Sequence, residues 1–289
     1  MKIWINGKIV GEGEAVLPVT DHGLLYGDGI FEGLRVVAGR VFRIERHLER
    51  LAFGARVLAL ELPYSLAELR GIVEDTVRAF GEREAYVRLL VTRGVGPLGV
   101  DPTTCPRPNV VCIVSTIKLF NEEQRERGLD MVTSSYRRPP ADVLDVRVKS
   151  LNYLGSVLAK LEARKQGADE ALLLNPRGHI AEAAVANLFA LRGTTLLTPP
   201  ASDGCLEGIN RGAVMELAPQ LGLSVVERSL GRADLFQADE VFLTGSGAGV
   251  VAVRSLDGRT LGSGRRGPVT AELAALHRRL AETEGSALL

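Results

Sequence analysis

Lys149 is placed where a lysine side chain can act as a nucleophile. It stands between an expected extended segment and an expected amphipathic helix at residues 153–166, with apolar Val148 and Leu151 close by. A lysine at such a position can be desolvated, and burial disfavours the charged form of an amine. A neutral amine can form a Schiff base with a carbonyl compound. By spacing alone a solvated surface lysine is the commoner arrangement, so the residues around Lys149 must decide.

The elements that must position this lysine are a mixture of helices and strands. Asn6-Gly7 predicts a two-residue hairpin turn. Ser65 and Glu68 have the spacing of a capping box, and the helix that they start should end at Gly81. Strands are expected at residues 2–5, 8–10, 30–37, 41–44, 85–92, 109–115 and 130–134 and near Ala171, Leu188, Val225 and Val241; further helices are expected at residues 45–58, 153–166 and 211–221 and from about Pro268.

The length predicts two domains. The chain has 289 residues, whereas a single domain usually has roughly 100–200. The polar stretch that begins at Lys118 separates the two sets of elements. We therefore expect a small N-terminal domain at residues 1–118, a linker at residues 119–127 and a larger domain at residues 128–289, both of the α+β class.

Composition excludes several classes of protein. The 35 basic and 35 acidic residues balance, which argues against binding of nucleic acid by bulk positive charge. No apolar run approaches the roughly 18 residues that span a membrane, and the N-terminus lacks the apolar core of a signal peptide. Three cysteines without a C-x-x-C pair suit a reducing compartment. The chain is expected in the cytoplasm, without nucleic-acid or membrane partners.

Three other signals carry little weight. The loop from Gly94 to Gly99 matches G-x-G-x-x-G, but the prolines after it prevent the helix that a dinucleotide site needs. The small residues from Thr244 to Gly249 leave too little chain for a complete nucleotide domain, although their amides can approach an anion. The four histidines show no metal-ligand spacing, so no metal is expected.

Residues 149–160, K-S-L-N-Y-L-G-S-V-L-A-K, resemble the lysine segment of the class IV aminotransferases. These pyridoxal-phosphate (PLP) enzymes include the branched-chain and D-amino-acid transaminases. Further segments that are similar to family motifs follow in the family's order: D-H-G-L-L-Y-G-D-G-I-F-E-G-L-R at 21–35, H-L-E-R-L at 47–51, A-E-A-A-V-A-N-L-F at 181–189, L-E-G-I-N-R at 206–211 and the loop around Ser246. The resemblance covers nearly the whole chain. It implies a fold type IV enzyme, like D-amino acid aminotransferase, with a small α/β domain and a larger α/β pseudo-barrel domain that binds PLP.

The resemblance implies two roles that carry the chemistry. Lys149 would hold PLP as a Schiff base and, once displaced by the substrate amine, move the proton between the substrate α-carbon and the cofactor. Glu182 would pair with the pyridine nitrogen and keep it protonated, which makes the ring an electron sink. On residue type alone, Glu182 could instead be a surface glutamate at a strand end.

The remaining implied cofactor contacts concern the phosphate and the ring oxygen. Arg50 would bind the phosphate through charge-assisted hydrogen bonds. Amides of Ile209 and Asn210 at a helix start, together with Ser246, would bind the same group. Tyr153 would bond the ring oxygen, with a packing role as its rival.

The expected substrate-binding residues are Tyr26, Phe31, Tyr86 and Arg88, with Gly247 and Ala248 where the substrate carboxylate should lie. They are similar to the pocket of branched-chain aminotransferases, in which Arg88 would meet the distal carboxylate of 2-oxoglutarate. This implies a transaminase that moves the amino group of leucine, isoleucine or valine to 2-oxoglutarate. The resemblance also implies at least a homodimer, with the cofactor between the domains and the pocket completed by the second subunit.

Two departures keep other readings open. The family commonly has E-G-x-G-x-N where this chain has E-A-A-V-A-N at 182–187, and often G-T-A-A-E where this chain has G-S-G-A-G at 245–249. D-amino-acid transamination or aminodeoxychorismate lysis on the same fold is therefore the alternative. A nicotinamide oxidoreductase, on the glycine loop at 94–99, and a binding protein without catalysis are weaker hypotheses.

Overall fold

The computed structural model describes residues 1–289 except residue 118, so the expected domain boundary at Lys118 lies outside the described residues. The chain divides into two compact units. Unit 1 contains Met1–Ile117, Val148–Asn152 and Ala281–Leu289; unit 2 contains Lys118–Arg147 and Tyr153–Leu280. Each unit is therefore discontinuous in sequence, and the segment that carries Lys149 belongs to unit 1.

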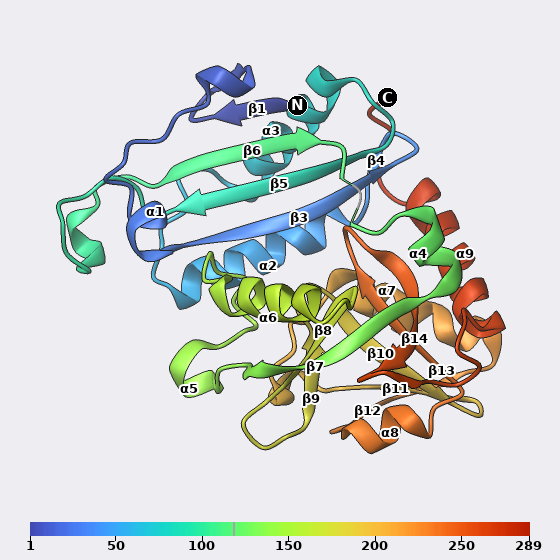
Figure 1. Cartoon of the computed structure of the whole chain (residues 1–289). Coiled ribbons are helices and arrows are strands. Elements are labelled where there is room, and N and C mark those ends of the chain that lie inside the picture. Colours follow the sequence, from blue (N-terminus) through green and yellow to red (C-terminus); the bar gives the residue numbers. More distant parts are fainter. Residues whose placement is uncertain (118) are drawn as a thin grey trace. The chain divides into compact units, whose positions relative to one another are not determined.

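Unit 1 is built on an antiparallel sheet with the strand order β2-β1-β6-β5-β3-β4 (Figure 1). Its strands are β1 (Lys2–Ile5), β2 (Lys8–Val10), β3 (Gly29–Val37), β4 (Arg40–Val41), β5 (Ala85–Thr92) and β6 (Asn109–Ser115), and its helices are α1 (His22–Tyr26), α2 (Ile44–Val57) and α3 (Leu66–Phe80). Apolar residues of α2, α3 and one sheet face form a single core, which includes Leu51, Val73 and Val87. This packing places the polar side chains of β3 and α2 at fixed positions.

The helix starts in unit 1 follow from local chemistry, with one correction. The capping box of Ser65 and Glu68 starts α3, and Gly81 ends it with a left-handed backbone, as expected. The expected strand at residues 41–44 is wrong, because β4 ends at Val41 and Ile44 already begins α2. Arg43 has φ 50°, a left-handed conformation that turns the chain directly from strand into helix.

Unit 2 is built on a mixed sheet, nine-stranded over the described residues, with the order β12-β11-β10-β13-β14-β7-β8-β9 and β15 paired to β14. β7 runs parallel to both β14 and β8, and β11 runs parallel to β12. The strands are β7 (Leu129–Arg137), β8 (Glu170–Leu174), β9 (Ile180–Ala183), β10 (Asn187–Arg192), β11 (Thr195–Thr198), β12 (Ser224–Glu227), β13 (Glu240–Gly245), β14 (Gly249–Leu256) and β15 (Arg259–Thr260).

Unit 2 also contains helices, several of which pack against this sheet. They are α4 (Glu122–Arg127), α5 (Ala141–Leu144), α6 (Leu154–Lys165), α7 (Ile209–Leu217), α8 (Arg232–Phe236) and α9 (Pro268–Thr283). α6 packs on β7 and β8 (Figure 1), in a core that includes Ala159 and Leu173. α7 and α9 share another core with β10 and β13, centred on the stacked rings of Phe189 and Phe242.

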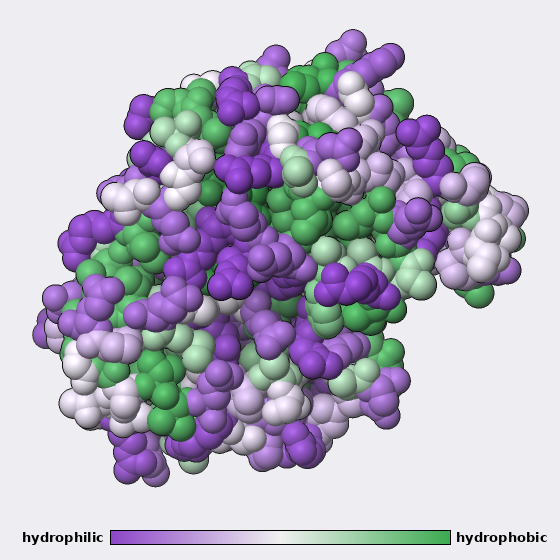
Figure 2. All heavy atoms as spheres, turned by 180° about the vertical axis from the view of Figure 1, so that it is seen from behind, coloured by the Kyte–Doolittle hydropathy of each residue, from purple (hydrophilic) through white to green (hydrophobic). Residues whose placement is uncertain are grey.

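The surface carries apolar residues between hydrophilic ones, as the face in Figure 2 shows. Within the described part of the chain, no helix combines the length and apolar character that crossing a membrane requires.

Candidate active site

The backbone of Lys149 is fixed against β3. The amide of Phe31 donates to the Lys149 carbonyl at 3.0 Å, and the amide of Leu151 donates to the Gly29 carbonyl at 2.9 Å. The Nζ atom lies 4.5 Å from the centroid of the Phe31 ring. Strand pairing thus holds the lysine, and its amine lies over an aromatic ring that attracts a cation and excludes water.

A buried carboxylate links Arg50 to His47 on α2. Glu32 on β3 accepts from Nε and Nη2 of Arg50, both at 2.8 Å, and contacts Nδ1 of His47 at 2.6 Å. Burial alone would raise the pKa of Glu32, but Arg50 and His47 outweigh it and lower that pKa to about 2. Glu32 is therefore ionised and holds the guanidinium in a bidentate pair.

The imidazole of His47 presents a buried polar atom without a partner. Burial lowers the pKa of His47, Glu32 opposes this, and the positive charges of Arg50 and Lys149 add to the lowering. The ring is therefore neutral near pH 7, with the Nδ1 hydrogen directed at Glu32. Its Nε2 atom is buried and has no hydrogen-bond partner among the described residues.

The expected substrate residues of unit 1 gather on β3 and β5, with one exception. The guanidinium carbon of Arg88 lies 4.5 Å from the Phe31 ring centroid, and Nη2 donates to the Tyr86 hydroxyl at 3.3 Å. The Arg88 Nε atom is buried and unpaired among the described residues. The Tyr26 hydroxyl instead accepts from the Gly99 amide at 2.8 Å, in the glycine loop. Phe31 thus brings Lys149 and Arg88 to one ring, whereas Tyr26 faces another segment of unit 1.

In unit 2, Glu182 is a buried carboxylate on β9 that contacts Arg138 and Asn187. Arg138 Nη2 lies 2.8 Å from Oε1, and the Asn187 side-chain amide donates to Oε2 at 3.1 Å. The same amide group donates to the Leu206 carbonyl at 2.8 Å. Asn187 therefore joins the glutamate strand to the turn at residues 206–211.

That turn leads into α7, whose start meets the loop after β13. Gly208 is the N-cap, and the first intrahelical hydrogen bond runs from the Gly212 amide to the Gly208 carbonyl. The amides of Ile209 and Asn210 precede this bond, at the positive end of the helix. The Asn210 side chain donates to the Ser246 hydroxyl at 3.0 Å. The two expected phosphate turns are thus hydrogen-bonded to each other.

The rest of the expected residues in unit 2 border these turns. Gly247 and Ala248 lie with Ser246 in the link between β13 and β14, where the Ala248 carbonyl accepts from Arg125 at 2.9 Å. The Thr244 hydroxyl is buried and has no hydrogen-bond partner among the described residues. Tyr153 is the N-cap residue of α6, and its carbonyl accepts from the Val157 amide at 3.0 Å.

Sequence reasoning missed several polar residues of these clusters: Glu32, His47, Arg138, Asn187 and His277. A signal existed for the first two and for Asn187, which ends the E-A-A-V-A-N segment at residues 182–187. Glu32 falls within F-E-G on an expected strand, and His47 and Arg50 share one face of a helix at i, i+3 spacing. Arg138 directly follows β7 and is far from Glu182 in the sequence. No local sequence pattern therefore predicts that the two residues are in contact.

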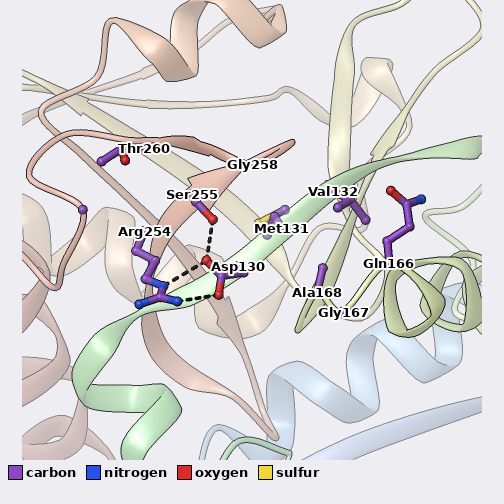
Figure 3. A pocket seen from close by; sticks show the side chains of 11 residues that line it. Asp130, Met131, Val132, Gln166, Gly167, Ala168, Arg254, Ser255, Gly258 and Thr260 are labelled. Carbon is purple, nitrogen blue, oxygen red and sulfur yellow. Dashed lines mark hydrogen bonds and ion pairs between the residues drawn. The ribbon is translucent and has the colours of Figure 1, made fainter.

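A separate hollow in unit 2, of about 410 Å³, contains none of the expected residues. Figure 3 shows Arg254 and Ser255 turned toward Asp130, and Arg254 bonds both carboxylate oxygens at 2.8–2.9 Å. The hydrogen bond from Arg254 lowers the pKa of Asp130 despite partial burial. Since the charged groups of this hollow satisfy each other, the candidate residues are instead two sets, one around Lys149 in unit 1 and one around Glu182 in unit 2.

Comparison with known proteins identifies the family of the chain. The model of the family "Amino-transferase class IV" matches residues 29–256. The chain belongs to the class IV aminotransferases. A relative from Methanocaldococcus jannaschii is 44% identical over 274 residues, 94% of each chain. A D-alanine aminotransferase from Bacillus licheniformis is 32% identical over 270 residues, 93% of each chain.

The fold agrees with the family assignment. The branched-chain amino acid aminotransferase of Thermobaculum terrenum, solved in its PLP form, superimposes with a TM-score of 0.88 at 30% identity, over 97% of this chain and 94% of that one. The expected fold type IV is confirmed, and this aminotransferase depends on PLP. Each unit has a buried polar atom without a partner among the described residues, His47 Nε2 in unit 1 and Thr244 Oγ1 in unit 2, and each set of residues therefore fits contact with a polar cofactor.

Proposed function

We propose that this aminotransferase moves the amino group of branched-chain L-amino acids to 2-oxoglutarate, with Lys149 as the residue that forms the Schiff base. The observation that carries the proposal is the cluster of Phe31, Tyr86 and Arg88 beside Lys149. Aromatic rings suit an apolar side chain, while one guanidinium suits the distal carboxylate of the acceptor. Such a pocket has separate groups for the two substrates.

In this proposal, the residues around Lys149 in unit 1 and those around Glu182 in unit 2 bind the same PLP molecule. When bound, PLP supplies an electron sink for the carbanion. Lys149 would move the proton between the substrate α-carbon and the cofactor, and Arg50, Ile209, Asn210 and Ser246 would bind the phosphate. Glu182, held by Arg138 and Asn187, binds the pyridine nitrogen, and Tyr153 the ring oxygen. Tyr26, Gly247 and Ala248 complete the proposed substrate contacts.

The absorption spectrum of the purified holoenzyme, before and after addition of L-leucine, tests the donor. Bleaching of the visible band by L-leucine, followed by its return with 2-oxoglutarate, is the expected result. A band that ignores L-leucine but responds to D-alanine would contradict the proposal. That second function has a specific observation in its favour, the 32% identity to a D-alanine aminotransferase.

Substitution of Arg88 tests the acceptor. Arg88→Gln is expected to lower kcat/KM for 2-oxoglutarate by roughly 10–100-fold, because a charge-assisted hydrogen bond is worth about 1.5–3 kcal/mol. kcat/KM for 4-methyl-2-oxopentanoate, which has no second carboxylate, should change little. Arg78→Gln, at a surface ion pair on α3, is the control. An equal loss for both oxo acids would contradict a role in binding the distal carboxylate.

We also propose that the enzyme is a cytoplasmic homodimer. The sparse, odd cysteine count supports the compartment. Val16, Val19, Leu24, Leu98 and Val100 are exposed apolar residues on two neighbouring segments of unit 1, together called the apolar patch, and they support the dimer. The backbone bridge between Asp21 and Val95 joins the two segments that carry these residues. Because exposed apolar clusters mark interaction surfaces, the proposed occupant of this patch is a second copy of the chain.

A further inference from the structure

Three side chains from separate elements of unit 2 form a hydrogen-bonded chain that ends at the proposed phosphate turns. His277 Nε2 on α9 lies 2.8 Å from Asn210 Oδ1 on α7. Asn210 Nδ2 lies 3.0 Å from the Ser246 hydroxyl oxygen in the loop after β13. His277 and Asn210 are buried, with 8% and 3% of their surface exposed, whereas Ser246 is half-buried. The chain therefore leads from the core to the loop surface.

The chemistry of an amide gives this chain a direction. An amide oxygen only accepts and its nitrogen only donates, so His277 Nε2 must carry a hydrogen and donate to Asn210 Oδ1. This leaves Nδ2 to donate to Ser246, whose oxygen becomes an acceptor. The hydroxyl hydrogen of Ser246 is then directed elsewhere. With the Asn210 amide turned over, its oxygen would instead accept that hydrogen.

We infer that His277 is a positioning residue for cofactor binding, since it fixes the Asn210 amide so that the Ser246 hydroxyl donates to the phosphate. The inference rests on the proposed function, which places the phosphate at Ile209, Asn210 and Ser246. His277 itself does not touch the phosphate in this scheme. It determines how many donors the phosphate meets.

The affinity of the cofactor-free full chain for PLP and for inorganic phosphate measures the effect. His277→Leu removes the donor to Asn210 and is expected to weaken both affinities roughly tenfold, as the loss of one hydrogen bond to a charged group does. His277→Gln is expected to restore most of the affinity, because its amide nitrogen can donate from nearly the same position. Asn210→Asp keeps the shape but accepts the Ser246 hydrogen, so it should weaken binding more than His277→Leu does.

A double-mutant cycle separates orientation from simple packing. In the Ser246→Ala background there is no hydroxyl to orient, so His277→Leu should cause no further loss of phosphate affinity. A packing role predicts the same loss in both backgrounds, and this result would overturn the inference. Thr270→Val is the control on α9. It removes a part-buried 2.6 Å hydrogen bond to Glu240 rather than one to Asn210, and should lower stability but not affinity.

The outcomes distinguish this inference from the proposed function. A wild-type chain that binds neither PLP nor phosphate would defeat the proposed phosphate contacts. If the wild type binds PLP and phosphate and His277→Leu binds them with the same affinity, only the role of His277 would be contradicted. A third outcome is possible. PLP binds tightly, its affinity depends on His277 only while Ser246 is present, and L-leucine does not react. This outcome would support the inference and contradict the proposed substrate. If His277→Leu fails to fold, Asn210→Asp carries the comparison, because its carboxylate accepts the Ser246 hydrogen that the phosphate would otherwise receive.

Discussion

Glu32 shows how unit 1 tolerates charges below its surface. A carboxylate alone in such a place would become protonated rather than stay charged. Here Arg50 meets both of its oxygens, and the Nδ1 hydrogen of His47 adds a third contact. The carboxylate in turn keeps Arg50, which is only 11% exposed on its side chain, from being an unpaired cation. The pair fixes the arginine before any cofactor is bound.

Glu32→Gln is expected to destabilise the protein by roughly 3 kcal/mol near neutral pH. The figure follows from a pKa lowered from 4.5 to about 2 on folding, at about 1.36 kcal/mol per unit. Because the folded pKa is the lower one, this stabilisation is present above pH 4.5 and is lost as the pH falls toward 2. Urea unfolding at several pH values measures this. The free energy of unfolding of the variant should therefore fall less between pH 5 and pH 2 than that of the wild type.

Glu49→Gln is the matched control for this measurement. Glu49 pairs with Arg46 on the exposed face of α2, with 59% of its side chain accessible. Such surface pairs contribute about 0–1 kcal/mol. If Glu32→Gln destabilised the chain no more than Glu49→Gln, or equally at pH 3 and pH 7, the argument for a buried ionised carboxylate would be contradicted.

At the scale of elements, the junction between β10 and the start of α7 depends on a glycine. A Cβ atom added at Gly208 would lie 2.0 Å from Asn187 Oδ1. Asn187 cannot move away without losing its bonds to Glu182 and the Leu206 carbonyl. The glycine is needed for space rather than for an unusual backbone, since its φ is −70°.

Gly208→Ala is expected to weaken PLP binding roughly tenfold or more, because displacement of Asn187 breaks at least one buried hydrogen bond. Titration of the cofactor-free chain with PLP measures this. Gly212→Ala, four residues further along α7 with nothing within 4 Å of the added Cβ, is the control. It should leave binding unchanged and stabilise the helix by about 0.5–1 kcal/mol. Equal affinities for the two variants would contradict the argument.

Local chemistry predicts most elements and their ends. The capping box at Ser65 and the strands at residues 85–92 and 109–115 appear where the sequence places them. The strands missed, β9, β11, β14 and β15, are short or almost wholly buried, so they lack the alternation of polar and apolar residues that marks a half-buried strand. The sequence also does not predict the turn at Arg43, because an arginine does not indicate a left-handed backbone.

At the scale of the whole molecule, the family motifs locate the candidate residues but not their partners. Lys149, Arg50 and Glu182 are found from their surrounding motifs. Their supports come from distant segments: Glu32 for Arg50, Arg138 for Glu182 and His277 for Asn210. Spacing along the chain also does not reveal that residues 148–152 belong to unit 1. They pair with β3, a strand more than a hundred residues earlier in the chain. Long-range pairing of this kind is set by tertiary packing.

The apolar patch of unit 1 gives the last prediction. Leu98 and Val100 are 81% and 80% exposed, in a loop tied to residues 20–26 by backbone and tyrosine hydrogen bonds. Burial of an apolar side chain between two copies contributes roughly 1.5–3 kcal/mol, and a charge there would have to be desolvated.

Leu98→Glu is therefore expected to shift the enzyme from twice the chain mass of 31.0 kDa toward the single-chain mass. Light scattering over a range of concentrations measures the shift. The control, Val226→Glu on β12 of unit 2, places the same charge outside the patch and should leave the mass unchanged. A wild-type monomer, or a Leu98→Glu variant with wild-type dimer affinity, would show that a second copy does not cover this patch.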